Sequence, residues 1–446
     1  MVKYFNIKKR YGGIIMTKKL ISFLLSIATA FLSLFLPATK TEAPKDTSTF
    51  APVIRFAVFS DTHVLAIGDT RSRRLQKVLS LAYSDAEQDE NYKAVDAALI
   101  AGDLTDNGTI AQYIGFKATV DSVLKDETVL MPVVAKNHDG YTYFEKAPSV
   151  YENITGLNSD FHNVVNGFHF IGISASKTKG EHYSEYQREW LKEQLAAAAS
   201  EDPEKPIFVI HHEHVSGTVY GSRDEDGWGL DYFKDILCEY PQIVDFSGHS
   251  HYPINDPRSI WQGEFTAVGT GTLKYVELTV DGKNRVNPDR YKKIAQMWIV
   301  EVDKNNSVRL RAFDALSATL LCESIIDNPS DKNNRQYSYE NRLAESSAPK
   351  FSDNAELTVK KVAGKYKVTA PKAESTDGNV VFLYRIYVYG RNGELTACEY
   401  ELNNFWLGET YENVTFKVKA DKGSVIKVVA ENAYGMQSDS LSVQLA

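Results

Sequence analysis

Cysteine is scarce in this chain. The three cysteines, Cys238, Cys322 and Cys398, lie far apart and have no metal-ligand spacing. An odd and small count argues against a disulfide scaffold, because such scaffolds need paired cysteines at high density. We therefore expect all three to be small, buried, apolar residues.

The chain also lacks an excess of positive charge. Its 50 lysines and arginines are outnumbered by 58 aspartates and glutamates, so the formal net charge is -8. Nucleic-acid-binding surfaces need a basic excess, and the composition indicates no such surface. A phosphate-bearing ligand would need cations placed locally, because the overall field repels it.

One long hydrophobic run is present near the N-terminus, at residues 20–38. Two lysines precede it, and this order is typical of a signal peptide. We predict that residues 1–38 form this signal, with Met16 as the true start. The run nearly spans a bilayer, so an uncleaved anchor is the alternative. In either case we expect a secreted or cell-surface protein whose only link to the membrane or envelope is this segment.

The rest of the chain divides by composition into several parts. Residues 39–52 are polar and are predicted to form a flexible tether. From Val53, apolar runs with β-type composition alternate with helix-like stretches, which is typical of a layered α/β fold. We predict one such domain over residues 53–326. Its expected helices cover residues 71–84, 110–124 and 183–198.

The last hundred residues have a different pattern. Residues 327–349 are polar and aperiodic, so we predict a linker there. Residues 350–446 alternate polar and apolar positions, with a hairpin expected near Gly364 and a strong turn signal at Asn392–Gly393. This pattern favours an all-β sandwich. The stretch "IKVVAENAYGMQSDS" resembles the late strands of fibronectin type III domains, and another immunoglobulin-like sandwich remains an alternative.

Five short polar motifs occur in order, each where an apolar strand is expected to end. Ligands of α/β proteins gather at such strand ends. All five together are typical of a shared metal site rather than of separate solvated loops. The motifs are DTH (Asp61, His63), GDLTDNG (Asp103, Asp106), KNHD (Asn137, His138, Asp139), HHEH (His211, His212, His214) and GHSH (His249, His251).

The donor types narrow the choice of metal. Carboxylates, imidazoles and an amide are present without a thiolate, which excludes a cysteine-rich zinc site and suits Fe, Mn, Zn or Co. There are too many donors for one tetrahedral ion. We expect two ions bridged by Asp103, which lies in the middle of the set. Ions ~3.5–4 Å apart provide the two-metal geometry used on phosphate esters.

The motifs resemble those of the calcineurin-like metallophosphoesterases, which include purple acid phosphatases and class III cyclic nucleotide phosphodiesterases. The resemblance covers roughly residues 54–314. It implies a four-layer α/β/β/α sandwich with two divalent or trivalent transition-metal ions at its edge. It also implies the ligands of each ion: Asp61, His63 and His251 for the first, Asn137, His211 and His249 for the second, and Asp103 for both.

The resemblance also bears on two adjacent histidines. In the family the ligand directly follows the apolar strand, which is the position of His211. His212 is then expected to face the other way or to lie behind the ligands as a substrate contact. For His214, a substrate contact and a loop residue remain equally open.

The expected chemistry is hydrolysis of a phosphate ester. Two cations lower the pKa of a shared water, so that a metal-bridging hydroxide can attack phosphorus near neutral pH. His138 is the candidate general acid, and Asp139 is expected to orient it and to favour its protonated form. The alternative for this pair is a hydrogen bond that only stabilises the loop. Asp106 is expected to fix the loop around Asp103.

Two further positions concern specificity. The glycine-rich insert at residues 216–233 carries Arg223 and Trp228, which could contact a phosphate and an apolar or base moiety. A solvated acidic loop is the alternative. Lys136 stands where the family usually has glycine, at a cost of about 1–2 kcal/mol if the backbone is left-handed. The simplest expectation is that its ammonium group points to solvent.

Two functions follow from these observations. The first is a secreted, dinuclear-metal-dependent phosphoesterase that acts on small phosphate mono- or diesters. The alternative is a surface binding protein on the same fold with weak or no activity. The full set of candidate ligands favours the enzyme, because loss of function usually shows first among ligands.

Overall fold

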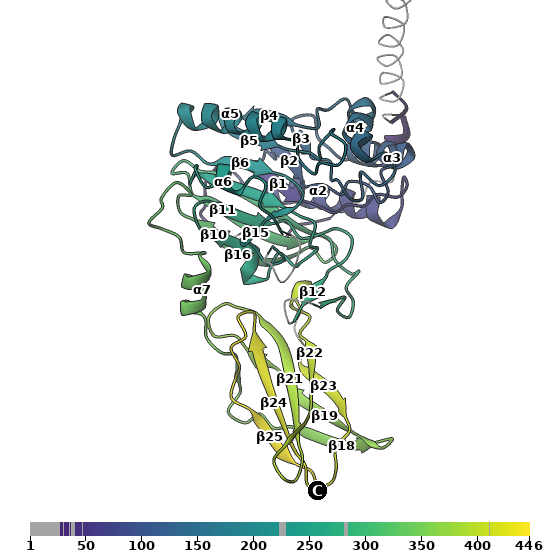
Figure 1. Cartoon of the computed structure of the whole chain (residues 1–446), viewed down its shortest axis with the longest axis vertical. Helices are drawn as coiled ribbons and strands as arrows, with labels where there is room; N and C mark the ends of the chain where they lie inside the picture. Colours follow the sequence, from purple (N-terminus) through teal and green to yellow (C-terminus); the bar gives the residue numbers. More distant parts are fainter. Residues whose placement is uncertain are drawn as a thin grey trace, which may run out of the picture.

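The computed structural model describes residues 27–29, 31–34, 36, 41–46, 48–222, 229–280, 284–409 and 411–446 (Figure 1). Most of the predicted signal peptide lies outside these residues. Within the described part of the chain, no helix is long and apolar enough to cross a membrane.

Two six-stranded sheets form the centre of the N-terminal domain. The first sheet has the order β16-β15-β14-β1-β2-β3, in which β1, β2 and β3 are parallel and the other pairs are antiparallel. Its strands are β1 Pro52–Phe59, β2 Ala97–Ile100, β3 Val129–Pro132, β14 Gln296–Asp303, β15 Val308–Asp314 and β16 Thr319–Ile326.

The second sheet has the order β10-β11-β9-β6-β5-β4. Its four central strands are parallel, and β4 and β10 are antiparallel at the edges. The strands are β4 Phe161–Val165, β5 Phe168–Gly172, β6 Ile207–Ile210, β9 Ile243–Ser247, β10 Ile260–Gln262 and β11 Thr266–Gly269.

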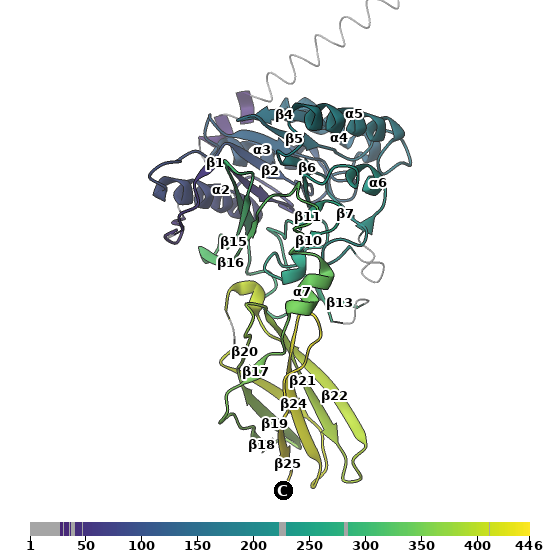
Figure 2. The same cartoon turned by 90° about the vertical axis from the view of Figure 1, so that its left-hand side faces the viewer.

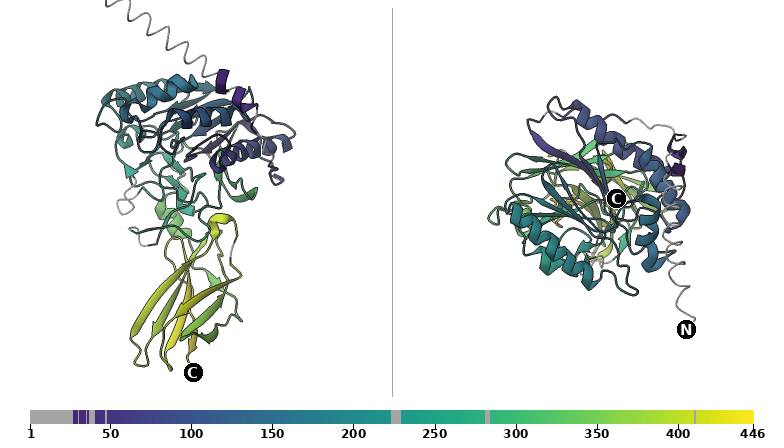
Figure 3. Two further views of the ribbon diagram at one scale, coloured as in Figure 1. Left: turned by 90° about the vertical axis from the view of Figure 1, so that its right-hand side faces the viewer. Right: turned by 90° about the horizontal axis from the view of Figure 1, so that it is seen from above.

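Helices cover the outer face of each sheet, as the view from above shows (Figure 3). The first sheet carries α2 Thr70–Gln88, α3 Ile110–Asp121 and α4 Ala147–Thr155, and the second carries α5 Glu185–Glu201 and α6 Lys234–Leu237. This order of layers confirms the predicted α/β/β/α sandwich. The three predicted helices are present with ends shifted by a few residues.

Side-chain alternation builds the core between the sheets. On β1, Phe56 and Val58 face the second sheet, while Ala57 and Phe59 face the helices. The ring of Phe56 lies edge-on to the ring of Phe208 on β6, with centroids 4.7 Å apart. Burial of each such side chain stabilises the fold by about 1.5–3 kcal/mol.

The C-terminal domain is all-β and extends away from the two sheets (Figure 2). It consists mainly of a four-stranded sheet, β22-β21-β24-β25, and a three-stranded sheet, β18-β19-β23, around a core of their own. Both predicted turns are present, with Gly364 and Gly393 at positive φ. The strands are β18 Thr358–Val362, β19 Lys365–Pro371, β21 Val381–Tyr389, β22 Leu395–Leu402, β23 Asn413–Val418, β24 Val425–Asn432 and β25 Leu441–Gln444.

Short elements complete the chain. A short helix, α7, lies within the predicted linker and has Ser338 at its N-cap. The aperiodic sequence of the linker did not predict this helix. The remaining elements lie in loops or at the junction of the two domains. They are η1 Phe144–Lys146, β7 His214–Val215, β8 Gly229–Leu230, η2 Pro257–Ser259, β12 Leu278–Thr279, β13 Arg285–Val286, α7 Tyr339–Glu345, β17 Lys350–Phe351, β20 Ala373–Glu374 and η3 Phe405–Leu407.

Two sequence expectations are wrong. Where it is described, the predicted tether packs on the domain: the Thr41 amide donates to Ser80 of α2 at 3.2 Å, and Asp46 pairs with the buried Arg309 at 2.6 Å. The polar composition of the tether suggested a flexible segment, because composition does not reveal that these polar side chains have partners in the domain. None of the three cysteines is buried as expected: Cys238 and Cys322 are partly exposed, and Cys398 is exposed on β22.

Candidate metal centre

The polar motifs converge at one edge of the two sheets. Asp61 follows β1, Asp103 follows β2 and Asn137 follows β3, whereas His212 follows β6 and His249 follows β9. These strands are parallel within their sheets, so their carboxyl ends lie at the same edge. The two sheets thus contribute side chains to a common cluster.

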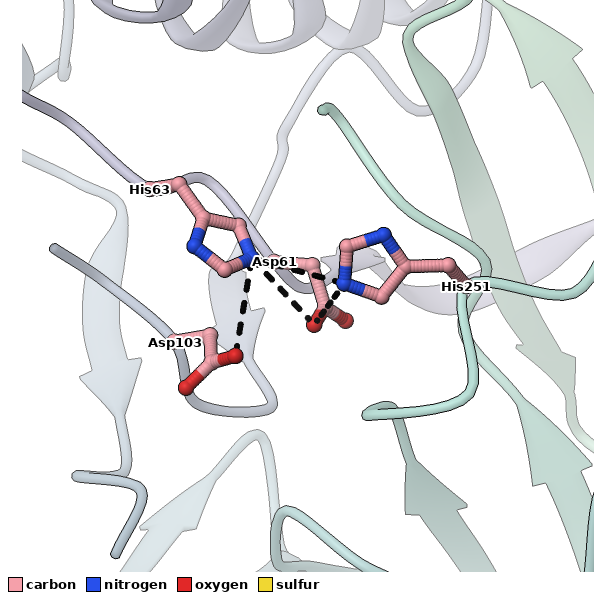
Figure 4. A group of neighbouring side chains, drawn as sticks. All are labelled: Asp61, His63, Asp103 and His251. Atoms are coloured by element: carbon pink, nitrogen blue, oxygen red, sulfur yellow. Dashed lines mark hydrogen bonds and ion pairs between the residues drawn. The ribbon is translucent and has the colours of Figure 1, made fainter. Parts of the chain in front are cut away.

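The first group of potential ligands is Asp61, His63, Asp103 and His251, all buried (Figure 4). His251 Nε2 lies 3.0 Å from Asp61 Oδ1 and 3.4 Å from His63 Nε2. His63 Nε2 lies 3.5 Å from Asp103 Oδ2. Two carboxylates and two imidazoles therefore direct donor atoms toward one point.

The second group is Asp103, His212 and His249, with Asn137 beside it. His212 Nε2 lies 3.5 Å from Asp103 Oδ1 and 3.1 Å from His249 Nδ1. Asn137 Nδ2 lies 3.2 Å from Asp103 Oδ2 and 3.3 Å from the same ring nitrogen of His249. Asp103 thus offers one oxygen to each group, the position predicted for a bridge.

The structure does not bring His211 to this cluster. Strand alternation places His212 on the inter-sheet side with Phe208 and Ile210, and places His211 on the helix side with Val209. His211 Nε2 pairs there with the buried Asp245 at 2.9 Å. The expectation that His211 rather than His212 faces the metals is corrected, because the family pattern did not fix the side of the sheet.

The histidine tautomers suit metal binding. His212 Nδ1–H donates to the Ala101 carbonyl at 2.7 Å, and His251 Nδ1–H donates to the Tyr275 carbonyl at 3.0 Å. Each ring therefore directs the lone pair of Nε2 into its group. Such a hydrogen bond on the far nitrogen is what orients metal-ligating histidines in proteins.

The backbone at the cluster is unusual. Positive φ angles are found at five of the candidate ligands: Asp61 (54°), His63 (46°), Asp103 (49°), His249 (72°) and His251 (59°). Each such conformation costs about 1–2 kcal/mol outside glycine. Strain of this kind gathers at functional sites, where the surrounding structure enforces it. The left-handed turns direct these side chains into the groups at the strand ends.

The electrostatics of the cluster fit a bound cation. Burial raises the pKa of Asp103 well above its usual range, and the neighbouring Asp61 carboxylate raises it further. Burial also lowers the pKa of His63 to about 4 and that of His249 to about 3, so both rings are neutral, which is the ligating form. Asp61 Oδ1, Asp103 Oδ1 and Asn137 Oδ1 are buried without a hydrogen-bond donor. A pair of transition-metal ions would satisfy these atoms.

The side-chain amide of Asn137 lies between Asp103 and His249. Its Nδ2 faces Asp103 and His249, while its Oδ1 is buried without a donor. A 180° rotation of the amide exchanges the two atoms, and their assignment follows from the hydrogen-bond network. With the oxygen toward the second group, Asn137 joins its donor set.

His138 lies beside the first group, with its ring edge-on to that of His63 and the centroids 4.4 Å apart. Burial lowers the pKa of His138, which opposes the expected preference for its protonated form. Its Nδ1–H donates to the Asp106 carbonyl at 2.8 Å, rather than to Asp139.

Asp139 has a different role from the one expected. Its carboxylate accepts hydrogen bonds from the amides of Leu104, Thr105 and Ala135 and from the Thr105 hydroxyl. Asp139 thus joins the loops after β2 and β3 through partners other than His138. The sequence suggested that Asp139 pairs with its neighbour His138, because a sequence does not reveal hydrogen bonds to amides that lie far along the chain.

Asp106 supports the ligand His63. Its carboxylate lies 3.4 Å from His63 Nδ1, 2.8 Å from Arg71 and 3.0 Å from Lys274. Lys274 Nζ is also 3.3 Å from His63 Nδ1. These contacts explain Asp106 better than the expected loop bond alone. Arg71 and Lys274 were not singled out in the sequence, since no motif marks them.

Other residues near the cluster also escaped notice. The Tyr275 ring packs on the His251 ring with centroids 4.3 Å apart. Burial, followed by the nearby Glu277 carboxylate, raises the pKa of Tyr275 to about 12. Glu213 is buried beside His212 and accepts from His182 and from the Tyr183 hydroxyl, the latter at 2.6 Å. The position of Glu213 within the HHEH motif was the one feature of the sequence that could have pointed to this residue.

The remaining predicted positions lie away from the donor atoms. His214 is buried behind the ligand loop, 2.8 Å from both the Ser247 and Ser250 hydroxyls, so the loop-residue alternative fits it. Lys136 is exposed and does not adopt a left-handed backbone, as the simplest expectation had it. Arg223 and Trp228 lie outside the described residues.

The layered α/β domain brings together two groups of donors that could each hold a metal ion. Residues 54–253 match the family model of calcineurin-like phosphoesterases. The likeness stated from the motifs is thus confirmed for this domain. The comparison does not extend to the type of the C-terminal domain.

Two curated relatives share this domain. The chain is 30% identical over 210 residues to a probable cyclic nucleotide phosphodiesterase of Rhodococcus erythropolis, covering 43% of this chain and 63% of that one. It is 28% identical over 201 residues to a probable glycerophosphodiester phosphodiesterase of Arcobacter nitrofigilis, covering 43% and 70%. The match with the first thus spans less than two thirds of its length.

Among solved structures, the chain resembles a purple acid phosphatase from yellow lupin (Lupinus luteus) seeds. The TM-score is 0.44 at 13% identity, covering 68% of this chain and 56% of that one. A likeness this weak does not bear on function.

Proposed function

We propose that this protein hydrolyses small phosphodiesters with two bound transition-metal ions. The observation that carries the proposal is the double position of Asp103, which has one oxygen 3.5 Å from His63 of the first group and the other 3.5 Å from His212 of the second. The names of the two curated relatives favour a diester over a monoester. The ions are Fe, Mn, Zn or Co on the chemistry of the donors.

Each ion has its own set of residues in this proposal. Asp61, His63 and His251 would hold the first ion, Asn137, His212 and His249 would hold the second, and Asp103 lies between the two groups. When bound, two such ions supply hydroxide near neutral pH and neutralise charge on the phosphate oxygens.

The protein itself contributes orientation and a proton. The Asp106 carboxylate lies 3.4 Å from His63 Nδ1 and supports the position of that ring. His138 donates through Nδ1–H to the Asp106 carbonyl. Its Nε2 is therefore the atom that would donate a proton to the leaving oxygen. To donate there, the ring must be protonated, and the negative charge of a bound phosphate favours that form. Asp139 keeps the two loops together.

A direct assay tests the proposal. The purified chain is loaded with Mn²⁺, Zn²⁺, Co²⁺ or Fe²⁺ and offered a generic aryl phosphodiester and the matching monoester. We expect turnover of the diester that depends on the metal and is faster than that of the monoester. A folded, metal-loaded protein without turnover would contradict the proposal and leave a binding protein on this fold.

Location and the type of the last domain are part of the same proposal. The lysine pair and apolar run at residues 18–38 support secretion, with the metal centre outside the cytoplasmic membrane. N-terminal sequencing of protein recovered from the medium and from membranes tests this and distinguishes cleavage from an anchor. The fibronectin type III resemblance of residues 350–446 stays a prediction, which an experimental structure of the domain would decide.

A further inference from the structure

The C-terminal domain packs directly on the segment that carries His251. A shared apolar cluster, separate from the core of either domain, fills the junction. The N-terminal domain contributes the first five of its buried members and the C-terminal domain the rest. They are Tyr220, Tyr252, Val276, Leu278, Ile294, Phe382, Leu383, Leu402, Phe405, Trp406, Leu407 and Ala433.

A stack of four side chains crosses this junction. The Phe382 ring of the C-terminal domain lies 5.0 Å from the Arg258 guanidinium, and Arg258 lies 3.8 Å from the Tyr220 ring. The Tyr220 and Tyr252 rings are 4.2 Å apart, and Tyr252 directly follows His251. Asp256 holds the guanidinium with contacts of 2.7 and 2.8 Å, so the stack is fixed in place.

Two backbone carbonyls of η3 reach the same segment. Asn255 Nδ2 donates to the Phe405 carbonyl at 2.8 Å, and Gln296 Nε2 donates to the Trp406 carbonyl at 3.0 Å. Gln296 in turn accepts from the Ile254 amide at 3.2 Å through its Oε1. The C-terminal domain therefore holds residues 252–256, a segment that directly follows the candidate ligand His251.

The loop expected to face substrate rests on the same residues. Tyr220 and Gly221 belong to the insert at residues 216–233, and the Tyr220 amide donates to the Arg258 carbonyl at 2.9 Å. A Cβ atom on Gly221 would lie 2.8 Å from Ser250 Cβ, so this loop and the ligand loop are in close contact. One junction thus supports both the metal side and the substrate side of the site.

From this packing we propose that the C-terminal domain is a positioning part of the metal centre rather than a separate binding module. Phe382, Arg258 and Tyr220 fix residues 249–256, so that His251 is held in the direction that the first ion requires. The inference rests on the metal binding in the proposed function. It does not depend on which ester, if any, is hydrolysed.

The test uses two variants of the full chain that are matched in residue type and burial. Phe382 lies at the junction and Phe416 in the core of the sandwich, each with 4% of its surface exposed. Phe382→Ala is expected to weaken Mn²⁺ binding about tenfold, the scale seen when a residue behind a ligand is lost. Phe416→Ala is expected to lower the melting temperature and leave the Mn²⁺ dissociation constant unchanged.

A second readout needs neither metal nor activity. Amide hydrogen exchange of the metal-free protein is expected to speed up at residues 249–256 in Phe382→Ala and not in Phe416→Ala. Phe382→Tyr keeps an aromatic ring on Arg258 and is expected to restore both properties. If Phe382→Ala fails to fold, Phe382→Leu takes its place, because it keeps apolar volume without the stacked ring.

The outcomes separate the two hypotheses. Equal metal affinity and equal exchange in the Phe382 and Phe416 variants would overturn the positioning role. A wild-type protein that binds two ions but hydrolyses no ester would contradict the proposed function alone, while metal affinity and exchange still decide the role of the junction.

Discussion

Asp103 is the residue on which both groups of ligands depend. Asparagine has nearly the same shape and tolerates a left-handed backbone, so Asp103→Asn removes the charge and leaves the turn at φ 49° intact. We expect this variant to lose bound metal and to lower kcat by at least about a hundredfold. Metal content by mass spectrometry and the diester assay check it. Near-normal metal content and rate would contradict the bridging position.

The two adjacent histidines offer a sharper comparison. His212→Ala removes a donor of the second group, so we expect one ion per chain instead of two. His211→Ala leaves the fully buried Asp245 without its partner. We expect it to retain both ions while the free energy of unfolding falls by about 3–5 kcal/mol. Metal stoichiometry and urea unfolding of both variants make the measurement; the reverse pattern would restore His211 as the ligand.

Replacement of Lys136 is expected to change metal binding and rate very little. Because its side chain is exposed and its backbone is not left-handed, Lys136→Gly gains no relief of strain. We expect metal affinity and rate to stay the same, and the unfolded chain to gain entropy that lowers stability by about 0.4–1 kcal/mol. Calorimetric metal titration and denaturant unfolding test this. A large gain in metal affinity would show that the ammonium opposes the ions.

At the scale of elements, the ligand loop after β9 depends on a buried imidazole. Burial, followed by the neighbouring His249 and His211, lowers the pKa of His214 to about 3. In the unfolded chain the pKa returns to its ordinary value of 6.5. As the pH falls below 6.5, the unfolded state binds a proton that the folded state does not bind, so stability is lost.

This linkage predicts a difference between the wild type and His214→Gln in the metal-free form. Lowering the pH from 7 to 5 is expected to cost the wild type about 2 kcal/mol more than the variant. Urea unfolding at the two pH values gives the comparison. Identical pH dependence of the two proteins would mean that the folded imidazole accepts the proton.

Elements also show what could be predicted from sequence. Apolar runs located β1, β2, β3, β6 and β9, and the motifs at their ends located the metal centre. The choice between His211 and His212 failed because it depends on which face of β6 meets the other sheet, and both faces are apolar. The prediction that Asp139 pairs with His138 failed for a similar reason. Two of the hydrogen bonds that Asp139 accepts come from amides 34 and 35 residues away in the chain.

At the scale of the whole molecule, contacts between distant parts were the least predictable. The predicted tether packs through Asp46 on Arg309, and the Phe405 carbonyl of η3 accepts from Asn255, over separations that no local pattern reveals. From composition, the tether was predicted to be flexible, and the residues of η3 were assigned to a separate C-terminal domain. The domain order and the α/β and all-β classes followed from local periodicity, which is what sequence patterns report.

The left-handed turns at five ligands have a consequence for how the protein acquires its metals. Those conformations are enforced by the surrounding fold, so the coordinating geometry is prepared during folding and does not wait for the ions. We therefore expect a chain purified without metal to accept ions afterwards, with little change in its circular dichroism. Which ion occupies the centre in a living cell would then be decided by supply and exchange after folding, rather than by the moment of synthesis.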